Sequence, residues 1–254
     1  MAKFQLTIIG SGTMMPTKAR HPSCYLLEIN TRKILLDIGH TSVARLIDLG
    51  IDLHSIDTLF ISHFHTDHIG DMLPFVHARF VDDGQHPERQ HQPLTIIGPK
   101  TIQERYKKLR EVSWPEPYEN YPIKFIEGAR NITIDNTRIE IFDVKHVEWF
   151  SSVGIKITCD KKSLIYTGDI GSDHPIQNLK KMAQNIDLLL IEAGHTKLVY
   201  NHFTIEQIIE IVRDSHVKRA IATHVRDTNL SVFKKQIKNC KNIILAKDLM
   251  KVKI

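Results

Sequence analysis

Four side chains that commonly bind divalent metals lie within a single short segment of the sequence. Neutral imidazole nitrogens and ionised carboxylates are preferred donors for zinc and related metals. The apolar residues Leu59–Ile61 before the segment predict a buried strand, and a helix is expected to begin after Gly70. A strand-to-helix corner aims neighbouring side chains at one small volume. The sequence therefore predicts a metal site formed by His63, His65, Asp67 and His68.

Core packing is the alternative explanation for these residues. A single histidine on an apolar face is more often a hydrogen-bonded core residue than a ligand. Here the order is H-x-H-x-D-H, and residues 59–78 contain no Lys or Arg that would offset the cost of burying the cluster. We therefore favour metal binding over core packing.

Two metals need more than four protein ligands, so additional His or Asp residues are expected at later strand ends. Three polar residues directly follow an apolar strand, which is where α/β scaffolds display reactive groups. Each alone fits a helix cap or a surface position equally well. Together with the corner they fit a dinuclear site; they are His146, Asp169 and His224.

The composition is that of a soluble globular protein, with 42% hydrophobic and 25% charged residues in 254. No apolar run is long enough to cross a bilayer, so no membrane association is expected. The three cysteines are scattered, which favours a reducing cytoplasm over a disulfide framework. A net charge of +5 is compatible with an anionic substrate, although part of it comes from a lysine-rich C-terminal end.

The pattern of apolar residues predicts an α/β domain covering residues 1–254, a four-layer αββα sandwich of two mixed sheets with outer helices. The strands between 123 and 167 are expected to be antiparallel because their connections are short. Polar residues 82–93 predict a surface loop, and the aromatic loop 114–122 either walls a pocket or packs on the surface. Expected strands are 4–9, 24–29, 33–37, 59–61, 94–97, 123–126, 131–134, 138–144, 152–158, 163–167, 186–191, 219–223, 243–246 and 249–253; expected helices are 42–49, 70–80, 101–112, 175–184, 204–215 and 230–239.

The corner motif, a lone His, Thr-Gly-Asp and a final His resemble the metallo-β-lactamase superfamily over nearly the whole chain. The resemblance implies two divalent metal ions, usually Zn²⁺, with Mn²⁺ or Fe²⁺ also suited to nitrogen and oxygen donors. It implies a nucleophilic hydroxide between the metals, which lower the pKa of bound water. It assigns His63, His65 and His146 to the first metal and Asp67, His68 and His224 to the second, with Asp169 bridging.

An Asp at the bridging position resembles the phosphodiesterase and glyoxalase-like branches more than the lactamases. Three segments are similar to ribonuclease Z: Pro16–His21, with His in place of an expected Asn; Ile191–Gly194, with Gly in place of Thr; and Asn201–Thr204. By this resemblance His202 is the general acid, oriented by Glu192, and Asp67 is a ligand that also accepts protons. The alternatives are a surface residue for His202 and a capping or ion-paired carboxylate for Glu192.

One departure from ribonuclease Z concerns its tRNA-gripping arm. Only 22 residues separate His146 from Asp169, enough for two strands and a turn, so the arm is absent. The cations Lys18, Arg20, Arg79 and Arg105 are candidates for phosphate contacts, but scattered solvated charges are the favoured interpretation.

These features favour a ribonuclease Z-like, metal-dependent phosphodiesterase acting on a cyclic nucleotide or short RNA. The alternatives are tRNA 3′-end processing without the arm, hydrolysis of an ester, thioester or lactone, and a non-catalytic metal-binding scaffold. The resemblance also suggests a homodimer, which the sequence itself neither supports nor excludes.

Overall fold

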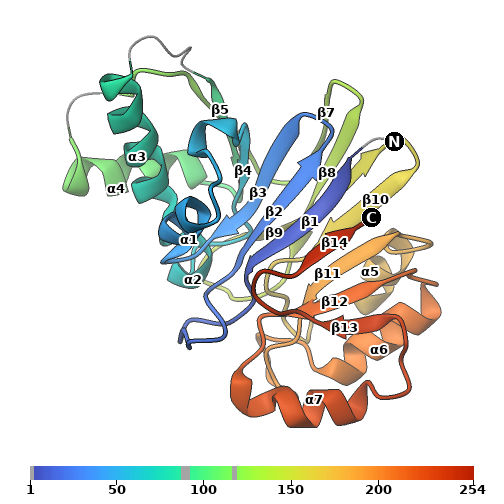
Figure 1. Ribbon diagram of the computed structural model, residues 1–254. Coiled ribbons are helices and arrows are strands. Elements are labelled where there is room, and N and C mark those ends of the chain that lie inside the picture. The colour runs from blue at the N-terminus through green and yellow to red at the C-terminus, as the bar shows by residue number, and fades with distance from the viewer. Residues whose placement is uncertain (1–2, 87–91, 116–118) are drawn as a thin grey trace.

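The protein forms two seven-stranded β-sheets that pack face to face, with helices on both outer surfaces (Figure 1). This architecture comes from a computed structural model that describes residues 3–86, 92–115 and 119–254. The prediction of a four-layer αββα sandwich is confirmed. The loops 82–93 and 114–122 lie partly outside the described residues, so the role of loop 114–122 as a pocket wall stays a prediction.

Each sheet is antiparallel on one side and parallel on the other. In the first sheet β14, β1, β2 and β3 are antiparallel, and β3 to β6 are parallel. In the second, β7 to β10 are antiparallel, and β10 to β13 are parallel. The first sheet contains β14 (Lys251–Lys253), β1 (Phe4–Gly10), β2 (Cys24–Ile29), β3 (Arg32–Ile38), β4 (Thr58–Phe60), β5 (Leu94–Gly98) and β6 (Ile123–Glu127). The second contains β13 (Ile243–Leu245), β12 (Ala220–Thr223), β11 (Leu188–Glu192), β10 (Lys162–Tyr166), β9 (Ser152–Cys159), β8 (Thr137–Val144) and β7 (Arg130–Ile134).

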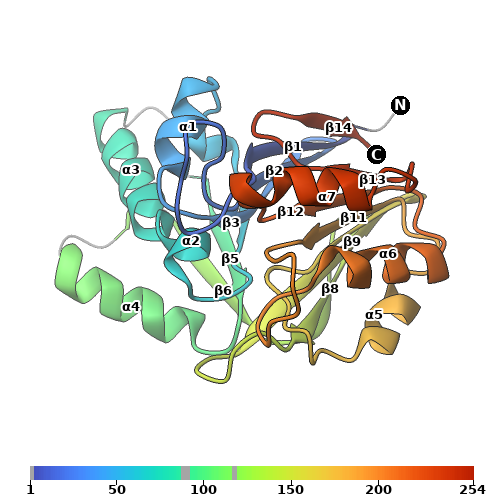
Figure 2. The same cartoon turned by 90° about the horizontal axis from the view of Figure 1, so that it is seen from below.

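The helices are divided between the two outer faces, and Figure 2 shows α1 to α4 on one side of the sheets and α5 and α6 on the other. Helix α6 shows why these segments become helical. Thr204 and Gln207 form a capping box at its start, and apolar residues recur on its buried face. The helices are α1 (Ser42–Asp48), α2 (Thr66–Ile69), α3 (Met72–Gln85), α4 (Ile102–Ser113), α5 (Ile176–Met182), α6 (Ile205–Asp214) and α7 (Leu230–Gln236), with 3₁₀ turns η1 (Leu53–Ser55) and η2 (Asp227–Asn229).

The apolar side chains form three clusters that match the four layers. One lies between the sheets and includes Leu6, Tyr25 and Ile155. A second lies under α5 to α7, and a third under α1 to α4. Burial of a side chain such as Leu6 stabilises the fold by roughly 1.5–3 kcal/mol. The parallel strands, buried on both faces, form the rigid frame from whose ends the site loops extend.

Three sequence predictions about the elements are wrong in detail. Strand β6 pairs in parallel with β5, so the antiparallel block begins only at β7. A helix begins at Thr66 rather than after Gly70, because the corner closes as the one-turn helix α2. Helix α3 continues to Gln85, into the predicted polar loop, because its buried stripe extends as far as Asp83. Within the described residues, no helix has the length and apolar character that a membrane span requires.

Candidate metal centre

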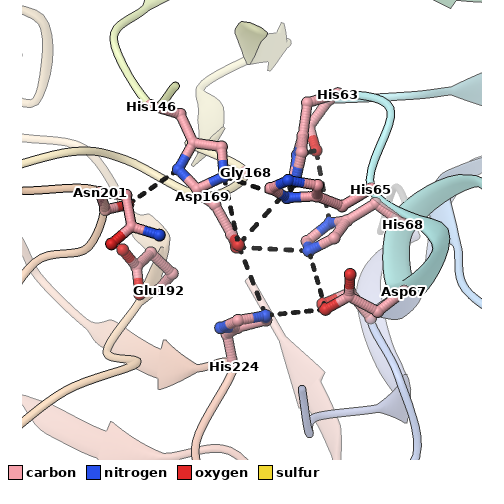
Figure 3. A network of polar contacts seen from close by, with 12 residues as sticks. His63, His65, Asp67, His68, His146, Gly168, Asp169, Glu192, Asn201 and His224 are labelled. Carbon is pink, nitrogen blue, oxygen red and sulfur yellow. Dashed lines mark hydrogen bonds and ion pairs between the residues drawn. The ribbon is translucent and has the colours of Figure 1, made fainter. Parts of the chain in front are cut away.

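The seven predicted ligands converge at one end of the sandwich, although they come from four segments, which follow β4, β8, β10 and β12. Figure 3 shows their side chains pointing toward one volume around the Asp169 carboxylate. Three groups of donor atoms each lie within 4.8 Å of one another, and the third joins Asp169 and His224 to His202. The first group is His63, His65, His146 and Asp169, and the second is Asp67, His68 and His224.

In the first group, three imidazole nitrogens face one another. His65 Nδ1 lies 3.0 Å from His63 Nε2 and 3.2 Å from His146 Nε2. Nitrogen ligands about 2.0–2.1 Å from a tetrahedral zinc are about 3.3 Å apart, so this spacing fits one ion between them. In the second group His224 Nε2 lies 3.1 Å from Asp67 Oδ2.

Asp169 lies between the two groups. Its Oδ2 is 3.9 Å from His63 Nε2 and 3.4 Å from His224 Nε2, while its Oδ1 is 3.3 Å from His68 Nε2. One carboxylate therefore reaches both groups, which is the place of a bridging ligand. The position follows from β10, whose end leads through Thr167 and Gly168 into the site.

Gly168 is required by the backbone at this turn. Its φ of +60° is unfavourable for residues with a side chain, and a Cβ there would come within 2.4 Å of Ser62 Cβ. Ser62 itself precedes the first ligand, and its carbonyl accepts a hydrogen bond from Val153 N at 2.9 Å. The glycine thus lets the bridging loop approach the corner closely.

Hydrogen bonds from neighbouring groups fix how the ligand rings are turned. His146 Nδ1 donates to the Asn201 carbonyl at 2.8 Å, and His68 Nδ1 donates to Asp37 Oδ2 at 2.6 Å. Because Nδ1 carries the proton in both rings, the lone pair of Nε2 is directed into the site. His63 Nδ1 lies 3.0 Å from Ser62 Oγ and is fixed in the same way.

Asp37 is a site residue that sequence reasoning missed. It is fully buried at the end of β3 and accepts hydrogen bonds from Ser62 N and Ser62 Oγ as well as from His68 and Tyr166. A signal was present, because Asp37 follows the apolar run Ile34–Leu36 just as Asp169 follows its own strand. Asp37 would have been a candidate if every carboxylate that directly follows an apolar strand had been considered.

His63, His146 and Asp67 have the protonation states of metal ligands. Burial lowers the pKa of His63 far below its usual value and lowers that of His146 to about 4, so both rings are neutral. Burial would raise the pKa of Asp67, but His68 and His224 outweigh it and bring the pKa to about 2. Neutral imidazoles and an ionised carboxylate are the forms that bind divalent cations.

Buried polar atoms also indicate that positive charge belongs here. His68 Nε2 and Asp169 Oδ1 are buried and make no hydrogen bond to any residue that the structure describes. Burial opposes a charge on His68, yet Asp169, Asp67 and Asp37 together raise its pKa well above the usual value. A cation between these groups would satisfy both the orphaned atoms and the carboxylates. The residues present therefore fit a metal centre.

The predicted pair Glu192 and His202 lies beside this centre. His202 Nδ1 is 3.2 Å from Glu192 Oε1 and 3.8 Å from Asp169 Oδ2. Glu192 is almost fully buried and also accepts hydrogen bonds from Phe203 N and Gly194 N. Burial would lower the pKa of His202, but the Glu192 carboxylate outweighs it and raises the pKa to about 9.

A cavity of about 470 Å³ opens onto the ligands. His65, Asp67, Asp169, His202 and His224 form one side of it. The rest of its lining comes from two segments that sequence reasoning did not connect, residues 12–15 and Thr17 with Arg20, and residues 225–228. Arg226, two residues after a ligand, is a further cationic group that was missed there.

The four cations that were candidates for phosphate contacts differ in their burial and in their partners. Arg79 is fully buried and donates to the carbonyls of Ile56 and Gln92, so that prediction is wrong. Arg20 is 5% exposed and hydrogen-bonded to Asp227. Arg105 is exposed, with its guanidinium carbon 4.2 Å from the Phe64 ring centre. Lys18 is exposed, in the loop between β1 and β2.

Comparison with known proteins points to one fold and one group of relatives. A family model described as anti-Pycsar protein Apyc1 matches residues 4–243. Ribonuclease Z of Staphylococcus epidermidis is 26% identical, covering 87% of this chain and 88% of that protein. The metallo-β-lactamase fold protein YhfI of Bacillus subtilis has a TM-score of 0.83 at 20% identity over all of both chains. The short form of human tRNase Z has a TM-score of 0.79 at 18% identity, covering 98% of each. The fold is thus that of the metallo-β-lactamases.

Proposed function

The chain belongs to the anti-Pycsar protein Apyc1 family, and from that premise we propose that it is a metal-dependent phosphodiesterase that opens a cyclic nucleotide. The coarser description, a metallo-hydrolase of the metallo-β-lactamase fold with ribonuclease Z-like relatives, rests on the comparisons and the ligand clusters. Under the proposal, residues 1–254 act as one hydrolase domain.

The ligands of the proposed dinuclear centre are those of the two clusters. His63, His65 and His146 would hold one cation, and Asp67, His68 and His224 the other, with Asp169 between them. When bound, divalent cations lower the pKa of water and stabilise the negative charge that develops on a phosphoryl group. Zn²⁺ suits this donor set, and Mn²⁺ or Fe²⁺ also fits.

The observation that carries the proposal is the pair that His202 forms with Glu192 beside the predicted ligands, with His202 Nδ1 3.2 Å from Glu192 Oε1. The Nδ1 proton of His202 is held by Glu192, so Nε2 is the position from which a second proton can be donated. As a water oxygen bonds to phosphorus, that water would lose a proton to Asp67. The P–O bond to the ribose breaks, and the His202 proton passes to the leaving ribose oxygen. An alkoxide is a poor leaving group, whereas a thiolate leaves without a proton. The pair therefore favours a phosphodiester over a thioester.

The dimensions of the site support a small substrate. A volume of about 470 Å³ is in the usual range for small-molecule pockets of roughly 300–1,000 Å³. Residues 147–168 form little more than strands β9 and β10 of the second sheet, so no arm projects between His146 and Asp169. A mononucleotide needs no such arm.

The second candidate is processing of tRNA 3′ ends, favoured by the ribonuclease Z relatives. It would require another surface to hold the tRNA. The four large apolar side chains that are at least 65% exposed on loops, Met15, Trp149, Leu198 and Tyr200, are available for such contacts.

A substrate panel separates these functions. Wild-type protein loaded with Zn²⁺ or Mn²⁺ is assayed on 3′,5′-cyclic nucleotides, precursor tRNA, bis(p-nitrophenyl) phosphate and a thioester, and its metal content is measured. We expect two metals per chain and turnover of cyclic nucleotides. Turnover of precursor tRNA alone would favour the second candidate, thioester turnover alone would overturn the phosphodiesterase, and a metal-free, inert protein would favour a scaffold.

Leaving-group dependence tests the role of His202. His202→Ala should lose activity on a cyclic nucleotide but keep most activity on bis(p-nitrophenyl) phosphate, because p-nitrophenolate leaves without a proton. The matched control is His77→Ala, since His77 stacks on Trp114 away from the ligands. Equal losses on both substrates would contradict the assignment of a general acid.

A further inference from the structure

Beyond the predicted ligands and His202, the cavity wall is built from two segments that are far apart in sequence. Residues 12–17 come from the loop after β1, and residues 225–228 follow the ligand His224. The backbone joins them directly at one point, where Val225 N donates to the Ser11 carbonyl at 3.1 Å. The other connections between them are made by side chains, and Arg20 is at their centre.

Arg20 makes three hydrogen bonds from a buried position. Its Nε donates to Asp227 Oδ1 at 3.0 Å, and its Nη1 donates to Ser11 Oγ and to the Ala246 carbonyl, both at 2.8 Å. The side chain is 6% exposed. One guanidinium thus connects the loop after β1, the segment after His224 and the stretch before β14.

Two carboxylates complete these connections. Asp227 Oδ2 accepts a hydrogen bond from Thr17 Oγ1 at 2.7 Å, so its two oxygens bind two residues of the loop, Thr17 and Arg20. Asp248 Oδ1 accepts from Ser11 N and Ser11 Oγ, and its Oδ2 accepts from His21 N. Ser11, Arg20, Asp227 and Asp248 thus connect the segments that form this wall.

From these contacts we infer that Arg20 is a positioning residue that fixes the substrate wall of the cavity through Asp227, rather than an anion-binding residue. The kinetic part of its test rests on the proposed function, because KM and kcat are measured with a cyclic nucleotide. A planar guanidinium can serve three acceptors in three directions at once, which the single ammonium of Lys cannot do in the same geometry. Without it, residues 12–17 would no longer be held against residues 225–228.

The competing role is a contact to the substrate phosphate. Arg20 lines the cavity, and its Nη2 makes no hydrogen bond to the described residues. The two roles differ in what they require. A phosphate contact needs positive charge and is indifferent to Asp227, whereas positioning needs the guanidinium shape and Asp227 together.

The test compares Arg20→Lys, Arg20→Met, Asp227→Asn and the double variant Arg20→Met/Asp227→Asn in the metal-loaded protein. The readouts are KM and kcat for a cyclic nucleotide, metal content, thermal unfolding, and hydrogen–deuterium exchange of residues 11–21 and 225–228. Arg32→Met is the matched control, because Arg32 also pairs with an aspartate, Asp57, at 2.7 Å, but at the opposite end of the strands.

Positioning predicts a KM raised at least about tenfold in Arg20→Lys, Arg20→Met and Asp227→Asn, with kcat changed less and metal content unchanged. The double variant should be no worse than Arg20→Met, because both changes break one connection. Faster exchange in both segments should accompany the KM change, and Arg32→Met should show neither effect.

Three results would overturn the inference. The first is that Arg20→Lys keeps full activity and only Arg20→Met loses it. The second is that Asp227→Asn has the KM of the wild-type protein. The third is that the effects of the two single substitutions add up in the double variant. If the wild-type protein hydrolyses no phosphodiester, the proposed function fails, but the exchange measurement still decides whether Arg20 and Asp227 hold the wall. If the Arg20 variants do not fold, Asp227→Asn still tests the inference. Asp227 is partly exposed, so its substitution should disturb folding less.

Discussion

The ligand corner and the cavity wall are both parts of one site. The residues of the corner are neighbours in the sequence, whereas the residues that hold the wall together are far apart in it. The corner places four ligands between residues 63 and 68. The wall depends on Arg20 reaching Asp227, 207 residues away, and on Ser11 reaching Asp248, 237 residues away. Local spacing thus determines the chemistry, whereas the surface against which a substrate lies depends on closure of the whole fold.

Removing a corner ligand should have the largest effect. Asp67→Ala is expected to abolish turnover, because it removes one of three donors in the second group. The fold should still unfold cooperatively, since the three apolar clusters do not depend on this side chain. Activity, metal content and thermal unfolding measured together check this. Retained turnover with full metal content would show that the corner is not the reactive region.

Removing the proton donor should leave the corner intact and slow the reaction. His202→Ala is expected to lower kcat by roughly 10²–10⁴-fold, the range for loss of a general acid. Metal content should not change, because the ligands keep their partners. The measurement is steady-state kinetics on a cyclic nucleotide with metal analysis. A variant that loses metal as well would place His202 among the ligands instead.

A change behind the ligands should have an intermediate effect. Asp37→Asn is expected to weaken metal binding or activity by roughly 10–100-fold, because the acceptor that orients His68 would be altered. Titration with Zn²⁺ in competition with a chelator measures it. An unchanged affinity would mean that the orientation of His68 is fixed by packing alone.

The smallest effect is on stability, at the point where the bridging loop meets the corner. Gly168→Ala should destabilise the fold by about 1–3 kcal/mol, through positive φ and contact with Ser62. Gly84→Ala is the control, because a Cβ there meets nothing within 4 Å and Ala favours a helix by about 0.5–1 kcal/mol. Denaturant unfolding compares them, and equal stability of Gly168→Ala and wild type would contradict the close approach.

The sequence predicted the layers, and it predicted which residues come together in the site, because both leave local signals. Apolar periodicity marks strands and helices, and His or Asp after an apolar run marks a strand end, as at His146 and His224. The structure brings these residues together, while their roles as ligands stay proposals. The cytoplasmic location and the homodimer also stay predictions.

Other features could not be predicted because their signals are not local. Strand β6 was placed in the wrong block since short connections do not reveal which sheet a strand joins. Arg79 looks like any cation in the sequence, and only the packing of α3 shows that it is buried. The burial of Arg20 and its hydrogen bond to Asp227 could not be predicted, because Asp227 lies in a distant segment that no spacing rule connects to it.

The pairing of β14 with β1 has a consequence for the order in which the site matures during translation. Asp248 and Ala246, which hold the loop after β1, are made more than twenty residues after His224. A nascent polypeptide emerging from the ribosome therefore possesses every metal-binding side chain before it can complete the surface that faces them. Under the proposed function, activity should therefore appear when β14 docks on β1, rather than when His224, the last predicted ligand, is made.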